Sequence, residues 1–241
     1  MMQNNGFSSG PSIHGDGRAD VTGSELVDLP DAQDSTLDVD RETLKTGTTT
    51  VGLKAEDGVV LVTDMRASLG NMVSSKATQK VEQVHPTAAM TIAGSVSAAQ
   101  SLLSTIEAEA KLYELRRDKE LSINGLSTLL GNLLRSGAFL VVVPVLGGVD
   151  DDGPHIYSFD ALGGKSEEDY AVSGSGTQFA LGVLENRYEE GISMDDAEDA
   201  AIDAVLTAIE RDTASGNGLT VARITADGVD IEKHEDLAEL Q

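Results

Sequence analysis

The chain has 241 residues, 41 acidic against 17 basic, and a formal net charge of −24 at pH 7. This acidity argues against nucleic-acid binding through a basic surface and against docking to an anionic membrane. The absence of cysteine excludes disulfides, thiolate zinc sites and cysteine nucleophiles. The four histidines are scattered without metal-ligand spacing, so we expect no metal and no cofactor.

The acidic composition also indicates the solvent in which the protein works. A strongly acidic chain with few lysines and only 3% aromatic residues is typical of proteins from concentrated salt, where screening removes self-repulsion. Ordinary acidic solubility is the alternative. The longest apolar stretch, Phe139 to Val149, is too short to span a bilayer, and no basic and apolar signal opens the chain. We therefore expect a cytoplasmic protein.

Residues 1–47 form a predicted leader. They are rich in Gly, Ser and Asp, show little periodicity, and carry nine acidic against three basic residues, so they cannot build a core. The remaining residues, 48–241, have the length of one domain.

The first strands are predicted directly after the leader. Residues 49–55 alternate between apolar and polar, and residues 59–62 are apolar throughout, as in a strand covered on both faces. Pairing Ala55 with Val59 across the intervening turn would place Asp64 and Arg66 on the face of Thr48. A one-residue slip would reverse that placement.

The rest of the chain alternates between strands and pairs of helices. Gly163-Gly164-Lys165-Ser166 is not a phosphate-binding loop, because Phe159 occupies the position of the first glycine of that motif. The element order predicts an α+β fold with two sheets between two helical layers. We expect helices at 97–120, 122–135, 177–188 and 193–211, and strands near 81, 88–94, 139–149, 155–159, 170–173, 219–224 and 229–233.

Thr48 is the candidate nucleophile. Threonine is a weak nucleophile unless a base activates it. If the chain were cut between Gly47 and Thr48, the new α-amine, with a reference pKa of about 7.7 to 8.0, would supply that base. Gly47 would let the hydroxyl approach the carbonyl to be attacked. The alternative is that a threonine run merely favours a strand.

Four motifs together resemble one known family. They are Thr-Gly-Thr-Thr-Thr-Val-Gly at 46–52, Ile-Ala-Gly at 92–94, Gly-Ser-Gly at 174–176 and Arg-Asp-Thr-Ala-Ser-Gly at 211–216. Over residues 48–233 the chain resembles the β-type subunits of the archaeal proteasome, which are N-terminal-nucleophile hydrolases. The resemblance implies a four-layer αββα sandwich and autocatalytic removal of the leader at Gly47-Thr48.

The resemblance also assigns roles to residues. It implies Thr48 as the nucleophile, Asp64 as its acidic partner and Lys80 as a buried cation that keeps the amine neutral. The Gly94 N–H would stabilise the oxyanion. The positions that would orient the amine and relay protons are Ser175, Asp212 and Ser215. The substrate pocket would be formed by Ala67, Ile92 and Val96, all apolar, which favours cleavage after large hydrophobic residues.

The partners implied by the resemblance are other subunits. The family forms seven-membered β rings stacked in pairs and flanked by α-type rings, with a regulatory ATPase that delivers unfolded proteins. Two alternatives remain: a non-catalytic ring subunit of the same fold, and a simpler ring protease of bacterial type. The joint presence of Gly47-Thr48, Asp64 and Lys80 argues against the first, and the 211–216 motif against the second.

Overall fold

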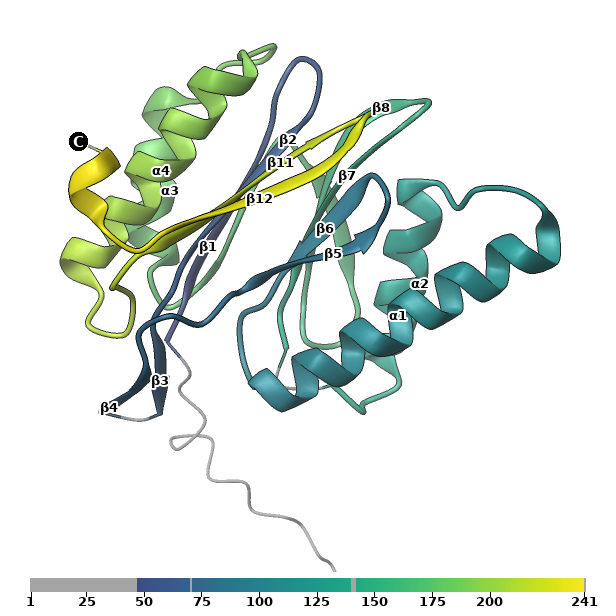
Figure 1. Ribbon diagram of the computed structural model, residues 1–241, viewed down its shortest axis with the longest axis horizontal. Helices are drawn as coiled ribbons and strands as arrows, with labels where there is room; N and C mark the ends of the chain where they lie inside the picture. Colours follow the sequence, from purple (N-terminus) through teal and green to yellow (C-terminus); the bar gives the residue numbers. More distant parts are fainter. Residues whose placement is uncertain (1–46, 70, 140–141, 241) are drawn as a thin grey trace, which may run out of the picture. The chain divides into compact units, whose positions relative to one another are not determined.

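The computed structural model describes residues 47–69, 71–139 and 142–240 (Figure 1). The predicted leader therefore lies outside the described residues, apart from Gly47. Within the described part of the chain, no helix is long and apolar enough to cross a membrane.

Two five-stranded antiparallel sheets form the centre of the fold. The first has the order β10-β1-β2-β11-β12, and the second the order β5-β6-β7-β8-β9. The first sheet contains β1 (Thr49–Lys54), β2 (Val59–Asp64), β10 (Tyr170–Gly174), β11 (Leu219–Thr225) and β12 (Gly228–His234). The second contains β5 (Val81–His85), β6 (Ala88–Thr91), β7 (Val145–Asp150), β8 (Gly153–Phe159) and β9 (Lys165–Glu168).

Two pairs of helices cover the outer faces of these sheets (Figure 1). Helices α1 (Val96–Arg117) and α2 (Ile123–Arg135) pack on the second sheet, and α3 (Thr177–Arg187) and α4 (Met194–Arg211) pack on the first. Separate apolar clusters fill the three interfaces between the four layers. The predicted four-layer αββα sandwich is confirmed.

Local sequence signals determine where helices α2 and α4 begin and which of their faces is buried. Ser122 caps α2 by accepting a hydrogen bond from the Gly125 N–H, and Ser193 caps α4 by accepting one from the Asp196 N–H. The buried stripe of α2 consists of Leu126, Leu130 and Leu134. The buried stripe of α4 consists mainly of alanines, which let this helix approach the first sheet closely: Ala197, Ala200, Ala201, Ala204 and Ala208.

Two expectations about the strands were wrong. The β1–β2 hairpin pairs Lys54 with Val59, one residue away from the expected register, because a four-residue loop replaces the shorter turn. The strand expected over 139–149 begins only at Val145, since Phe139 lies in a turn and Val142 forms only an isolated bridge with Gly94. The sequence reading also missed strand β9, the small hairpin of β3 (Ala67–Leu69) and β4 (Met72–Ser75), and the short 3-10 helix η1 (Leu237–Leu240).

Candidate active site

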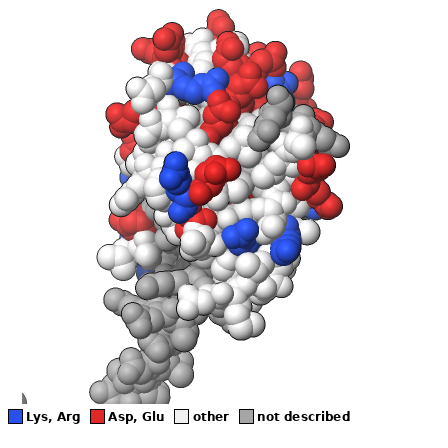
Figure 2. Space-filling view, turned by 90° about the vertical axis from the view of Figure 1, so that its left-hand side faces the viewer, with Lys and Arg blue, Asp and Glu red and all other residues white. Residues whose placement is uncertain are grey.

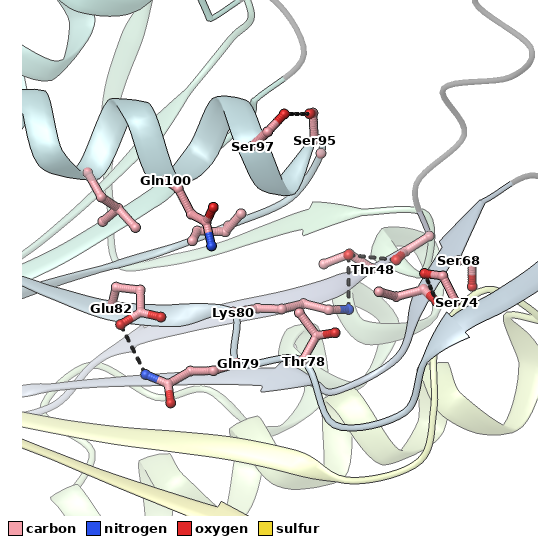
Figure 3. Close-up of a pocket in the computed structure, with 15 residues that line it drawn as sticks. Thr48, Ser68, Ser74, Thr78, Gln79, Lys80, Glu82, Ser95, Ser97 and Gln100 are labelled. Atoms are coloured by element: carbon pink, nitrogen blue, oxygen red, sulfur yellow. Dashed lines mark hydrogen bonds between the residues drawn. The ribbon is translucent and has the colours of Figure 1, made fainter.

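Thr48 lies immediately before β1 and is almost completely buried. Its hydroxyl donates a hydrogen bond to the Gly47 carbonyl oxygen at 2.6 Å and accepts one from Lys80 Nζ at 3.0 Å (Figure 3). The hydroxyl oxygen is thus held next to the peptide group that precedes it, with a cation on its other side.

Lys80 connects Thr48 to Asp64. Lys80 Nζ lies 2.7 Å from Asp64 Oδ1, and both side chains are buried. The Thr49 N–H donates to the same oxygen, while the N–H groups of Arg66 and Gly216 donate to Oδ2. Burial lowers the pKa of Lys80, and the charge of Asp64 opposes this effect. Four donors therefore hold one buried carboxylate, which in turn fixes the ammonium beside the threonine.

A second network of hydrogen bonds reaches the backbone nitrogen of Thr48. This nitrogen is still an amide while Gly47 is attached, and it donates to Ser175 Oγ at 3.2 Å. The Ser175 hydroxyl lies 2.5 Å from Asp212 Oδ2, and the Ser215 hydroxyl donates to the same oxygen at 2.7 Å. Cleavage before Thr48 would convert the amide into an amine that these groups already surround.

Gly94 lies on the wall of the cavity that opens at Thr48. Its φ of 126° is a conformation that favours glycine. In its bridge with Val142 the hydrogen bond runs from the Val143 N–H to the Ala93 carbonyl, so the Gly94 N–H is not used. Among the described residues no acceptor occupies this N–H.

The cavity at Thr48 has a volume of about 340 Å³ and is lined by residues of α1, β3, β4 and β5 and of the segments 78–80 and 92–95. Ala67 and Ile92, two of the three predicted pocket residues, line it. The side chain of the third, Val96, lies outside the described residues. Leu103 adds an apolar wall, and polar side chains project from several sides: Ser68, Ser74, Thr78, Gln79, Glu82, Ser95, Ser97 and Gln100 (Figure 3).

Comparison with known proteins identifies the family. A sequence model of the proteasome subunit family matches residues 44–224. The chain belongs to the proteasome subunit family. The proteasome subunit beta of Haloquadratum walsbyi is 59% identical over 238 residues, which is 98% of each chain. That of Halorubrum lacusprofundi is 57% identical over 97% of each chain, and that of Haloferax volcanii is 56% identical over 95% of this chain and 94% of its own.

These matches confirm the resemblance to archaeal β-type proteasome subunits from halophiles. As a member of this family, the chain is a subunit of proteasome rings that it forms with other subunits. The structure brings together the six side chains that the resemblance assigned to the chemistry, with Gly94 beside them. Their roles in catalysis stay predictions.

The sequence reading placed Arg66 wrongly and missed two other contributors to the geometry of this proteasome subunit, Ala214 and Glu82. Arg66 does not face Thr48: its guanidinium donates to Asn217 Oδ1 and to the Thr213 carbonyl, both at 2.8 Å, and thereby holds the loop that carries Asp212. Ala214 packs so closely on Gly47 that a Cβ there would lie 1.8 Å from its own Cβ. Glu82 was detectable, because it lies two residues after Lys80 and so on the same face of an extended strand.

Proposed function

We propose that this β-type subunit is a threonine endopeptidase of the proteasome core, with Thr48 as its nucleophile. The observation that carries the proposal is the position of Lys80 Nζ, which contacts both the Thr48 hydroxyl and Asp64 in a buried site. A non-catalytic ring subunit would have no need for a buried cation at this place, since even a paired buried charge stabilises a fold little compared with apolar packing.

The first reaction removes the leader. The Thr48 hydroxyl attacks the Gly47 carbonyl carbon, the Thr48 nitrogen departs with the hydroxyl proton, and an ester links Gly47 to the threonine oxygen. Water then hydrolyses this ester, which leaves a carboxylate on Gly47 and a free amine and hydroxyl on Thr48. The mature domain is 48–241.

The second reaction cleaves the substrate. The Thr48 amine accepts the hydroxyl proton as the oxygen attacks a substrate carbonyl, and the positive charge of Lys80 favours the neutral, basic form of that amine. The Gly94 N–H donates to the developing oxyanion. Ser175, Asp212 and Ser215 hold the amine and relay its proton to the departing peptide nitrogen. Water then hydrolyses the acyl ester.

The cavity supports cleavage after large hydrophobic residues. Ala67, Ile92 and Leu103 give it apolar walls, and its volume of about 340 Å³ accommodates a bulky side chain. An acidic side chain of the substrate would lose its hydration there and would meet the like charge of Glu82, which lines the same cavity.

The assembly we propose follows the resemblance. Seven copies form a β ring, two β rings stack face to face between α-type rings, and a cytoplasmic ATPase delivers unfolded proteins to the enclosed chamber. A simpler ring protease of bacterial type is disfavoured because the 211–216 loop contributes Asp212, Ser215 and the Gly216 N–H to the site.

Intact-mass measurement tests the proposal. The purified chain should begin at Thr48, and Thr48→Ala should retain the leader and hydrolyse no peptide, because one hydroxyl performs both reactions. Thr105→Ala, on the surface of α1, is the matched control and should mature normally. A Thr48→Ala chain cut after Gly47, in cells without another active β subunit, would refute autocatalysis.

A further inference from the structure

The cavity at Thr48 contains a carboxylate that the proposed chemistry does not use. Glu82 lies on β5 and pairs with Met90 of β6, whose side chain belongs to the apolar cluster beneath α1. Directly paired residues of neighbouring strands project to the same face, so Glu82 also projects towards α1. In Figure 3 it lies beyond Lys80 as seen from Thr48, and Gln100 of α1 points towards the same region.

The carboxylate of Glu82 is fixed in place and only half satisfied. Gln79 Nε2 donates to Glu82 Oε2 and to the Val81 carbonyl, both at 3.0 Å. The second oxygen, Oε1, accepts no hydrogen bond from the described residues. Burial raises the pKa of Glu82, and the hydrogen bond from Gln79 opposes this effect. A further donor would therefore stabilise the carboxylate.

The surroundings of Glu82 favour a neutral donor over a cation. The walls formed by Ile92 and Leu103 are apolar, and the ammonium-bearing side chain of Lys80 lines the same cavity. A substrate cation would have to enter beside a like charge and lose its hydration. A phenol has an apolar ring for the walls and one O–H for the carboxylate, at a low desolvation cost.

We propose that Glu82 is a specificity-determining residue that makes this cavity select tyrosine over phenylalanine as the residue after which the chain is cut. The inference rests on the proposed function and refines its preference for large hydrophobic residues. A site built to accept a hydrogen bond discriminates against the analogue that lacks the donor, because its acceptor is then left unpaired.

The test compares fluorogenic peptides that differ only in their last residue, Tyr, Phe or Arg, on the mature subunit assembled with its α-type partners. The ratio of kcat/KM for Tyr to that for Phe should be about tenfold in the wild-type particle. In Glu82→Leu it should fall to about one or below, mainly through faster cleavage after Phe. Glu82→Gln keeps a neutral acceptor and should give an intermediate ratio.

Glu109→Gln, which alters an exposed carboxylate of α1, is the matched control and should leave the ratio unchanged. Leader removal, measured by intact mass, reports whether each variant has folded. A ratio that is the same in the wild type and in Glu82→Leu would overturn the role of Glu82. Cleavage after Arg that exceeds cleavage after Tyr, with the excess lost in Glu82→Leu, would overturn the choice of a neutral donor. Failure of the proposed function is distinguishable, since hydrolysis would then be absent or would persist in Thr48→Ala.

Discussion

The structure contains two kinds of ion pair, and they differ in burial. At the active site Lys80 and Asp64 expose 4% and 0% of their side chains. Between the first sheet and α4, Arg223 pairs with Asp195 and Glu198, but Arg223 is 39% exposed and Asp195 87%. The face that carries α3 and α4 presents many more acidic than basic side chains (Figure 2).

The comparison separates buried charges that take part in the proposed chemistry from surface charges that are exposed to the solvent. A buried pair is only weakly screened by salt, and removal of one partner leaves an uncompensated charge. An exposed pair contributes little and is screened further as salt rises. The active site should therefore respond to single substitutions and the surface to ionic strength.

The largest effect is expected for Lys80→Ala. It removes the cation beside Thr48, so leader removal and peptide hydrolysis should both fall by about a thousandfold or more. The domain should still fold, because three backbone N–H groups continue to donate to Asp64. Intact mass, peptidase rate and circular dichroism measure the three quantities. Lys76→Ala, at an exposed position, is the control, and normal turnover of Lys80→Ala would contradict the assigned role.

A smaller effect, confined to maturation, is expected for Gly47→Ala. The new Cβ would overlap Ala214, so the scissile peptide should shift from the Thr48 hydroxyl and leader removal should slow by about a hundredfold. Chains that do mature no longer contain residue 47 and should hydrolyse peptides at the wild-type rate.

The companion variant Ala214→Gly, combined with Gly47→Ala, should restore part of the maturation rate. Gly182→Ala serves as the control, since a Cβ there meets nothing within 4 Å. Unchanged maturation of Gly47→Ala would show that the contact with Ala214 does not position the scissile bond.

The individual elements also show how much of the fold can be predicted from the sequence. The leucine stripe of α2 and the cap at Ser193 placed their helices to within a residue or two, because such signals are local. The register of the β1–β2 hairpin depends on the length of a turn, which the strand pattern does not determine. Strand β9 was missed because all four of its residues are exposed and show no alternation.

Local sequence patterns could not show that the residues of the site lie close together. Thr48, Asp64 and Lys80 lie at or beside the ends of three different strands. The β1–β2 pairing and the packing of the second sheet on the first bring them within hydrogen-bonding distance. Resemblance to a family named them in advance. It gave no indication of the contact between Gly47 and Ala214, which depends on the path of the 212–217 loop.

The third prediction moves from the buried pair to the surface. Residues 48–241 carry −18 of the formal charge of −24, and ring assembly collects many copies in one particle. The screening length is about 10 Å at roughly 0.1 M salt and about 3 Å at roughly 1 M. Dilute buffer should therefore dissociate the particle and reduce its peptidase activity, whereas molar salt should preserve both. Size-exclusion chromatography with activity assays across a salt series measures this, and a fully active particle at low salt would contradict it.

The smallest effect is expected for Arg223→Ala. Both of its ion pairs lie at the surface, so their loss should lower the free energy of unfolding by less than about 1 kcal/mol in dilute buffer and by almost nothing in molar salt. Denaturant unfolding of the chain at the two salt concentrations measures the difference, and Glu198→Gln should reproduce part of it. A loss that persists undiminished in molar salt would show that the Arg223 side chain stabilises the fold by packing between β11 and α4, because screening weakens charge interactions and leaves apolar contacts in place.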